Sequence, residues 1–184
     1  MRGNAERTLL DESEEPTERI RWLREGHSEP DLALVRTFEE QLVLEIEGLG
    51  GVRFCHGSPR SDTELVTPET PEVRVREWPA LAERVVVTAH THVQFDREVA
   101  GLRSVNPGSV GMAYEPLPGA YWALLGPDVE LRRTPYSIEL AAAAFAESGH
   151  PGAAQAIEVI STPPSRAEVI EHAERHVFSG LRRS

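Results

Sequence analysis

The sequence of 184 residues contains no lysine, one cysteine and no long apolar run. Its 19 basic residues are therefore all arginines, a bias that indicates codon usage in a GC-rich genome rather than a function. The single cysteine, Cys55, excludes an internal disulfide bond and suits a reducing compartment. No window approaches the ~20 apolar residues of a membrane span, and the first residues lack the apolar centre of a signal peptide. We therefore expect a cytoplasmic protein that does not enter membranes.

The charge balance restricts the partners. The formal net charge of -11 argues against non-specific binding to nucleic acid, which needs a basic surface to displace counterions from phosphates. An anionic membrane surface is disfavoured for the same reason. A substrate that carries phosphate would need a local positive charge, and a bound metal ion is the most direct source of one. The length fits one domain with a core of ordinary size.

Apolar periodicity and turn residues predict helices at both ends of the chain and hairpins between them. Residues 16–27 and 29–40 carry apolar side chains at helical spacing. Alternation over residues 41–59, around a Gly-rich turn, predicts a hairpin whose second strand ends at His56. The other expected elements are a short helix over 71–82, a strand over 84–89, hairpins over 94–109 and 119–136, and helices over 137–147, 152–160 and 166–178. This pattern predicts an α/β or α+β sandwich.

Three histidines follow apolar strands, where α/β folds place ligands. His56 ends one predicted strand, and His90 and His92 end another. On a regular strand, residues i and i+2 point to the same side, so both rings could reach one small volume. Neutral imidazole is a common ligand of divalent transition metals. Each residue has a plainer interpretation as a hydrogen-bonded loop histidine, but together the three favour a metal site.

The segments that carry these histidines resemble those of a known family. "RGNAER", "FCHGSP" and "AHTHVQFDREVAGLRSVNPGSVG" are similar to motifs of the calcineurin-like metallophosphoesterases, and the closest likeness is to the small bacterial phosphodiesterases of that superfamily. The resemblance runs from Arg2 to about Tyr136. It implies a sandwich of two mixed β-sheets flanked by helices. We expect one domain over residues 1–184, with a helical C-terminal segment over 137–184.

The resemblance also implies a site and an activity. Asn4, His56 and His90 would bind one metal ion, and His92 would bind a second. The ions would be Mn²⁺, Ni²⁺, Fe or Zn²⁺, and the family uses such a pair with a metal-bound hydroxide to hydrolyse phosphoesters. The implied function is that of a metal-dependent phosphodiesterase or phosphatase with a phosphoester substrate. The "NPGS" turn that begins at Asn106 is implied to lie near the site in a structural role.

The first metal motifs of the family have no counterpart here. An Asp-x-His and a Gly-Asp should precede "GN", but only Met1 and Arg2 do. We therefore expect a domain that is incomplete at its N-terminus and misses its first strands. The alternative is a truncated, non-catalytic remnant with weak or no metal binding. Loss of neighbouring strands would expose a sheet edge and an apolar face, so self-association into a homo-oligomer is expected.

Two further features have structural interpretations. The segment "HAERH" places His172 and His176 one helical turn apart, a spacing that is compatible with zinc. The surrounding residues are charged, however, which favours a solvated helix face. Cys55 and His56 are adjacent on a strand and should point to opposite faces. A nucleophile and base pair is therefore excluded, and we expect Cys55 to be a core thiol.

Overall fold

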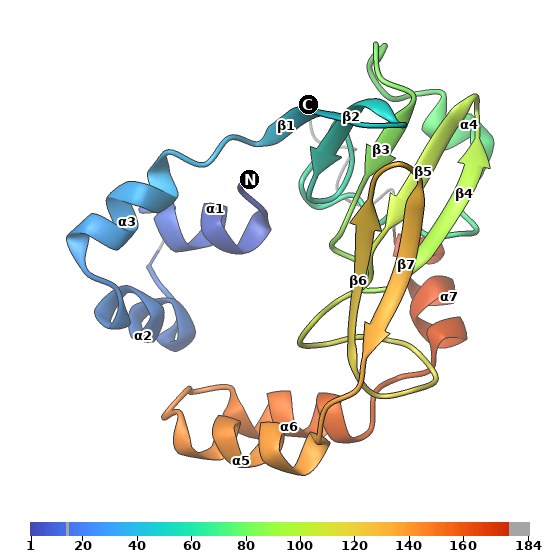
Figure 1. Ribbon diagram of the computed structural model, residues 1–184. Coiled ribbons are helices and arrows are strands. Elements are labelled where there is room, and N and C mark those ends of the chain that lie inside the picture. Colours follow the sequence, from blue (N-terminus) through green and yellow to red (C-terminus); the bar gives the residue numbers. More distant parts are fainter. Residues whose placement is uncertain (14, 177–184) are drawn as a thin grey trace.

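The computed structural model describes residues 1–13 and 15–176. It begins with a group of three short helices, α1 (Asn4–Leu10), α2 (Glu18–Gly26) and α3 (Glu29–Arg36), which stands apart from the sheets in Figure 1. Thr17 and Ser28 cap α2 and α3 through their hydroxyl groups. The helix predicted over 29–40 ends four residues early, because the chain turns at Thr37 and leads into the first strand.

The main sheet has five strands in the order β1-β2-β3-β5-β4. Its members are β1 (Gln41–Ile46), β2 (Gly50–Cys55), β3 (Val85–Val87), β4 (Phe95–Val99) and β5 (Leu102–Asn106). The central strands β2, β3 and β5 are parallel, while β1 and β4 run antiparallel at the edges. The sheet is therefore mixed, as expected. The predicted strand over 84–89 is shorter than expected, since its ladder ends at Val87.

A second sheet covers one face of the first. It is the antiparallel hairpin of β6 (Ala120–Leu125) and β7 (Val129–Thr134). Val85 and Val87 of β3 pack towards this hairpin, whereas Val86 between them packs towards the opposite face, beside Trp78. This alternation is the period of two expected of a strand. The predicted α/β sandwich is confirmed, and its second sheet consists of two antiparallel strands in the described part of the chain.

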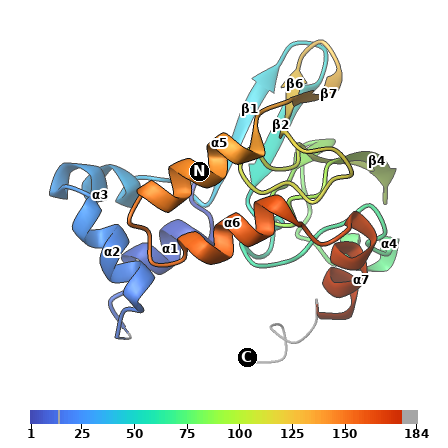
Figure 2. The ribbon, with the colours of Figure 1, turned by 90° about the horizontal axis from the view of Figure 1, so that it is seen from below.

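Helices complete the molecule. The helix predicted over 71–82 is confined to α4 (Glu72–Val75). The C-terminal segment forms α5 (Ile138–Glu147), α6 (Ala153–Ser161) and α7 (Arg166–His176), and residues 177 and 178 of the last predicted helix lie outside the described residues. Figure 2 shows α5 and α6 side by side next to the N-terminal helices. No helix in the described ranges is long and apolar enough to cross a membrane.

The last helix is fixed to the sheet domain by two polar anchors. At its start, Arg166 pairs with Glu115 and donates a hydrogen bond to the carbonyl of Gln94 at 2.9 Å. Near its end, Glu174 pairs with Arg74 at 3.1 Å, and Arg74 is only 2% exposed. Both anchors join residues far apart in sequence, so the position of α7 is determined by tertiary contacts.

Cys55 gives a direct test of the core. Its side chain is 1% exposed, and burial raises the pKa of the thiol to about 12. Because the thiolate is the reactive form, we expect no measurable reaction of the native protein with a disulfide reagent such as Ellman's reagent at pH 8. In urea, one thiol per chain should react at once. Rapid labelling of the native protein would contradict the described packing.

Candidate metal centre

Two of the predicted histidines meet at the ends of neighbouring parallel strands. His56 follows β2 directly, and His90 lies three residues after β3. The amide of Ala89 donates a hydrogen bond to the carbonyl of His56 at 2.7 Å, which ties the two chain ends together. His56 Nε2 lies 3.1 Å from His90 Nδ1. The structure thus brings together two imidazoles that are 34 residues apart in sequence.

The geometry of His90 and His92 differs from the expected one. They do not lie on a regular strand, because the chain leaves the ladder after Val87 and both residues adopt left-handed backbone conformations, with φ of 60° and 56°. The prediction that both residues lie on a regular strand is therefore wrong. A non-glycine residue with positive φ is uncommon and indicates a backbone held by its surroundings.

Buried hydrogen bonds hold this loop in place. Thr91, between the two histidines, is 2% exposed and donates to the carbonyl of Val66 at 3.0 Å. The amide group of Asn106 donates to Thr91 Oγ1 at 3.0 Å and to the carbonyl of Ala89 at 2.7 Å. Asn106 is fully buried at the end of β5. Its side chain therefore supports the loop that carries both histidines.

His92 is oriented by a hydrogen bond from its Nδ1 atom to the protein backbone. Its Nδ1 lies 2.9 Å from the carbonyl oxygen of Met112. A carbonyl can only accept, so Nδ1 carries the proton and Nε2 is left as a lone-pair donor. The ring also stacks on Tyr114, with centroids 5.7 Å apart. This arrangement is typical of a metal-ligating histidine whose other nitrogen is held by the protein.

The electrostatics keep all three rings neutral at pH 7. Burial lowers the pKa of His56 and of His92. Burial, reinforced by the neighbouring His56 and His92, lowers the pKa of His90 to about 4. Neutral imidazole is the form that binds a metal ion. The site therefore presents unprotonated nitrogen without first having to lose a proton.

Asn4 begins α1 close to this pair. Its neighbour Gly3 lies against the His56 ring, since a Cβ atom added at Gly3 would stand 2.8 Å from the His56 ring. The amide of Gly3 is held by Glu6 at 2.7 Å, which fixes the start of the helix. Asn4 is half-buried there. Its role as a ligand of the same ion as His56 and His90 stays a prediction.

The imidazole pair fits a single ion. Metal–nitrogen bonds of ~2.1 Å place two ligand nitrogens about 3.0 Å apart at a right angle and about 3.4 Å apart at the tetrahedral angle. The observed 3.1 Å lies between these values, and it also fits a hydrogen bond between the rings. In the described parts of the chain, no group of three or more His, Cys, Asp or Glu side chains is placed to hold a metal ion. Asp62, a nearby carboxylate, pairs with Arg7 at 2.6 Å.

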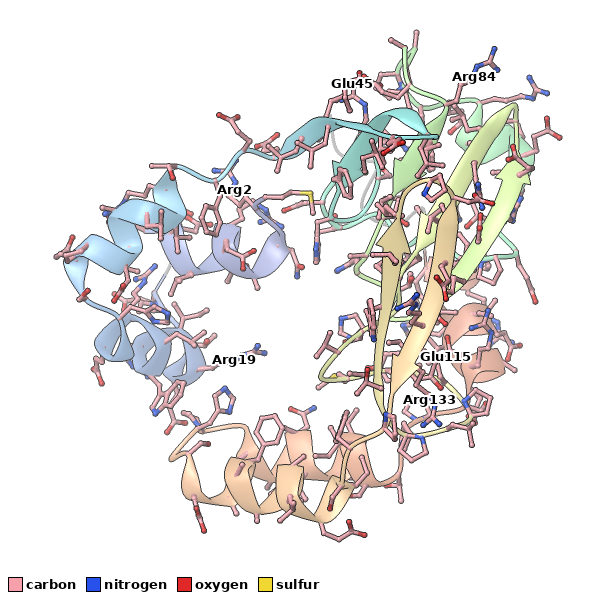
Figure 3. The ribbon with its side chains drawn as sticks, in the orientation of Figure 1. Arg2, Arg19, Glu45, Arg84, Glu115 and Arg133 are labelled. Atoms are coloured by element: carbon pink, nitrogen blue, oxygen red, sulfur yellow. The ribbon has the colours of Figure 1, made fainter. Side chains whose placement is uncertain are left out.

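A polar cavity of about 350 Å³ adjoins His56. Three arginines line it, and Figure 3 shows Arg2 between the N-terminal helices and β1. Each arginine is already paired with carboxylate: Arg2 with Glu40, Arg7 with Asp62, and Arg60 with Glu64 and Glu77. The cavity therefore offers hydrogen bonds but little uncompensated positive charge for a phosphate group.

A Gly3→Ala substitution should move the His56 ring. Gly3 has φ of -107°, so the backbone accepts alanine and the effect comes only from the close approach of the new methyl group. We expect the NMR signals of the His56 ring to shift. The matched control is Gly26→Ala, where an added Cβ would meet no atom within 4 Å. Unchanged His56 signals in Gly3→Ala would show that α1 does not pack on the ring.

The two histidines of the segment "HAERH" lie on a solvent-exposed face of α7, as the charged surroundings indicated. His172 and His176 are exposed, and their rings stack on each other with centroids 4.2 Å apart. Glu174 between them, in contrast, faces inward and makes the buried pair with Arg74.

Cys55 is a core thiol, as expected, with Sγ 3.9 Å from the carbonyl of Val87.

Comparison with known proteins places this geometry in context. The sequence profile of the calcineurin-like phosphoesterase superfamily domain matches residues 2–125. The structure is similar to a metallophosphoesterase from Sphaerobacter thermophilus, with 18% identity, a TM-score of 0.68 and coverage of 88% of this chain and 75% of that one. It is also similar to a hypothetical protein from Pyrococcus horikoshii OT3, with 17% identity, a TM-score of 0.66 and coverage of 90% and 73%. No curated protein matches significantly. At these identities the structural likeness supports the fold alone.

Proposed function

Because this chain belongs to the calcineurin-like phosphoesterase superfamily, we propose that it is a metal-dependent phosphoesterase whose metal is held at His56 and His90. The observation that supports this assignment is the 3.1 Å contact between their ring nitrogens. A bound divalent ion would supply positive charge to the phosphoryl oxygens and Lewis acidity for hydrolysis. The protein's own contribution is to hold two neutral imidazoles at the required separation.

The finer proposal is a two-ion site that acts on phosphodiesters or phosphomonoesters. Asn4 would add an amide oxygen to the ion at His56 and His90. His92 would use Nε2 for a second ion, because the carbonyl of Met112 holds its Nδ1. Mn²⁺, Ni²⁺, Fe and Zn²⁺ all accept imidazole with oxygen ligands. The two cavities that adjoin the imidazole pair, lined by His56 and by His90, give a phosphoester access to the site.

Hydrolysis of bis(p-nitrophenyl) phosphate and p-nitrophenyl phosphate tests the proposal. The purified chain should release nitrophenol in the presence of Mn²⁺, Ni²⁺, Fe²⁺ or Zn²⁺, and a chelator should stop the reaction. The His90→Ala variant should lose this activity, whereas His27→Ala should keep it, since His27 is exposed and lies at the end of α2. Hydrolysis that persists in excess chelator or in His90→Ala would refute the proposal.

A non-catalytic remnant is the second candidate. It is favoured by a specific observation: the described residues place no carboxylate with the histidines in a group suited to a metal ion. A bridging carboxylate is what normally holds two such ions together. Calorimetric metal binding without hydrolysis of either nitrophenyl ester would support this candidate over the enzyme.

Self-association and location are further proposals. In the described part of the chain, β1 is an edge strand, and its residues Leu42, Val43 and Leu44 are 36%, 44% and 51% exposed. Exposed apolar edges favour pairing with another copy. Light scattering should then show a mass above 20.4 kDa, and Val43→Lys should restore the monomer.

The single buried cysteine supports a cytoplasmic location.

A further inference from the structure

A second cavity, of about 500 Å³, adjoins the imidazole pair on the side of His90. Its lining is largely apolar and comes from segments far apart in sequence: Leu65, Tyr114, Val169 and Ala173. His56 belongs to the polar cavity and His90 to this one, while their rings are 3.1 Å apart. The imidazole pair therefore lies where a polar and an apolar cavity adjoin. A volume of this size is within the usual range for small-molecule sites, about 300–1,000 Å³.

The wall formed by α7 is held in place from both ends. Arg166 secures its first turn to Glu115, and Figure 3 places Glu115 near the lower end of the second sheet, beside this helix. Glu174 accepts hydrogen bonds from Thr67 at 2.6 Å and from Thr70 at 3.0 Å in addition to its pair with Arg74. Val169 and Ala173 lie between these anchors. The cavity is therefore preformed rather than shaped by a loose helix.

A negative charge stands at the edge of this cavity. Glu168 lines it and accepts hydrogen bonds from the hydroxyl and the amide of Ser165, at 2.7 and 2.8 Å. These bonds lower the pKa of the Glu168 carboxyl, so it is ionised at neutral pH. The exposed ring of His172 is the other polar group that α7 contributes. An anionic group that entered the cavity would meet the charge of Glu168.

We propose that this cavity receives the organic group of the phosphoester and selects an uncharged aromatic or apolar one. The inference rests on the proposed function, because it takes the phosphoryl group to lie at His90. The organic group would extend from there along Tyr114 and Leu65 to the α7 wall. A substituent that carries a second phosphate or a carboxylate would be disfavoured by Glu168. Val169 and Glu168 are then specificity residues, which act on the part of the substrate that does not react.

Binding of two phosphonates tests the inference without turnover. Phenylphosphonate and methylphosphonate share the same anionic head, and in the presence of Mn²⁺ the phenyl compound should bind to the full chain at least about tenfold more tightly, because its ring is buried. Val169→Phe should fill the cavity and abolish this preference, and Leu65→Phe should do the same from another segment of its lining. The matched control is Ala167→Phe, which adds the same ring at an exposed position of α7 outside the cavity lining.

The charge of Glu168 at the edge of the cavity allows a second, independent binding test. Glu168→Gln should improve binding of 4-carboxyphenylphosphonate about threefold or more, as expected for removal of a like charge near the surface, whereas Glu171→Gln, on the same helix outside the lining, should not. Equal wild-type affinities for the phenyl and methyl compounds, no binding of either, or a phenyl preference that survives Val169→Phe would overturn the inference. A phenyl preference that Val169→Phe removes, in a chain that hydrolyses no ester, would uphold the cavity's role and refute the proposed activity.

Discussion

His90→Ala is expected to weaken binding of Mn²⁺ or Zn²⁺ at least about a hundredfold, since loss of a mere supporting group around a metal ligand typically costs 10–100-fold. His90 supplies one of the two nitrogens that lie 3.1 Å apart. Its removal takes away the imidazole whose nitrogen lies 3.1 Å from His56 Nε2. Burial already keeps His90 neutral, with a pKa of about 4, so the substitution removes a ready donor rather than a charge.

Competition against a chromophoric chelator would measure this loss at pH 7.5. His27→Ala is the control, because it removes an imidazole that lies in the loop between α2 and α3 and should leave the affinity unchanged. Thermal unfolding should show that both variants are folded. If His90→Ala binds metal as tightly as the unsubstituted chain, the ion is held elsewhere. The contact between the His56 and His90 rings is then only a hydrogen bond.

Glu174→Ala is expected to lower the free energy of unfolding by about 2–3 kcal/mol, somewhat less than the 3–5 kcal/mol typical of breaking a fully buried pair. We expect a smaller loss of stability because only the Arg74 side chain is fully buried, at 3% exposed, whereas the Glu174 side chain is 21% exposed. Without Glu174, the Arg74 guanidinium loses a carboxylate partner, and the hydroxyls of Thr67 and Thr70 lose their acceptor.

Glu171→Ala on the same helix is the matched control. Glu171 pairs with Arg175, but both side chains are more than 60% exposed, so the loss should stay below about 0.5 kcal/mol. Urea unfolding with equal m-values would give the two free energies. If the two variants lose equal stability, the pair of Arg74 and Glu174 is not the anchor that holds α7 against the sheet domain.

The same anchor connects stability to the proposed substrate cavity. Glu174 holds the end of α7, and Val169 and Ala173 of that helix form one wall of the cavity beside His90. A loosened helix would leave the cavity without a fixed shape. Glu174→Ala should therefore also reduce the preference for phenylphosphonate, even though Glu174 does not line the cavity.

The amino-acid sequence by itself determined the features that depend on neighbours along the chain. Alternating apolar residues around glycine turns predicted the hairpins of β1 with β2 and of β6 with β7, and both are confirmed. The order of "GN", "CHG", "HTH" and "NPGS" predicted the superfamily, which the match over residues 2–125 confirms. The placement of His56 at a strand end was also predictable, since this histidine directly follows an apolar run of strand residues.

Only the tertiary structure decided the details of the site. Positive φ at His90 and His92 arises from buried bonds between their loop and Asn106 and Val66, which no local periodicity encodes. The seven-residue helix α1 is too short for a periodic signal and was not predicted. The charged pattern of α7 favoured a solvated face, yet Glu174 is held by Arg74, 100 residues away. A buried ion pair needs both partners brought together by the fold, so neither segment alone reveals it.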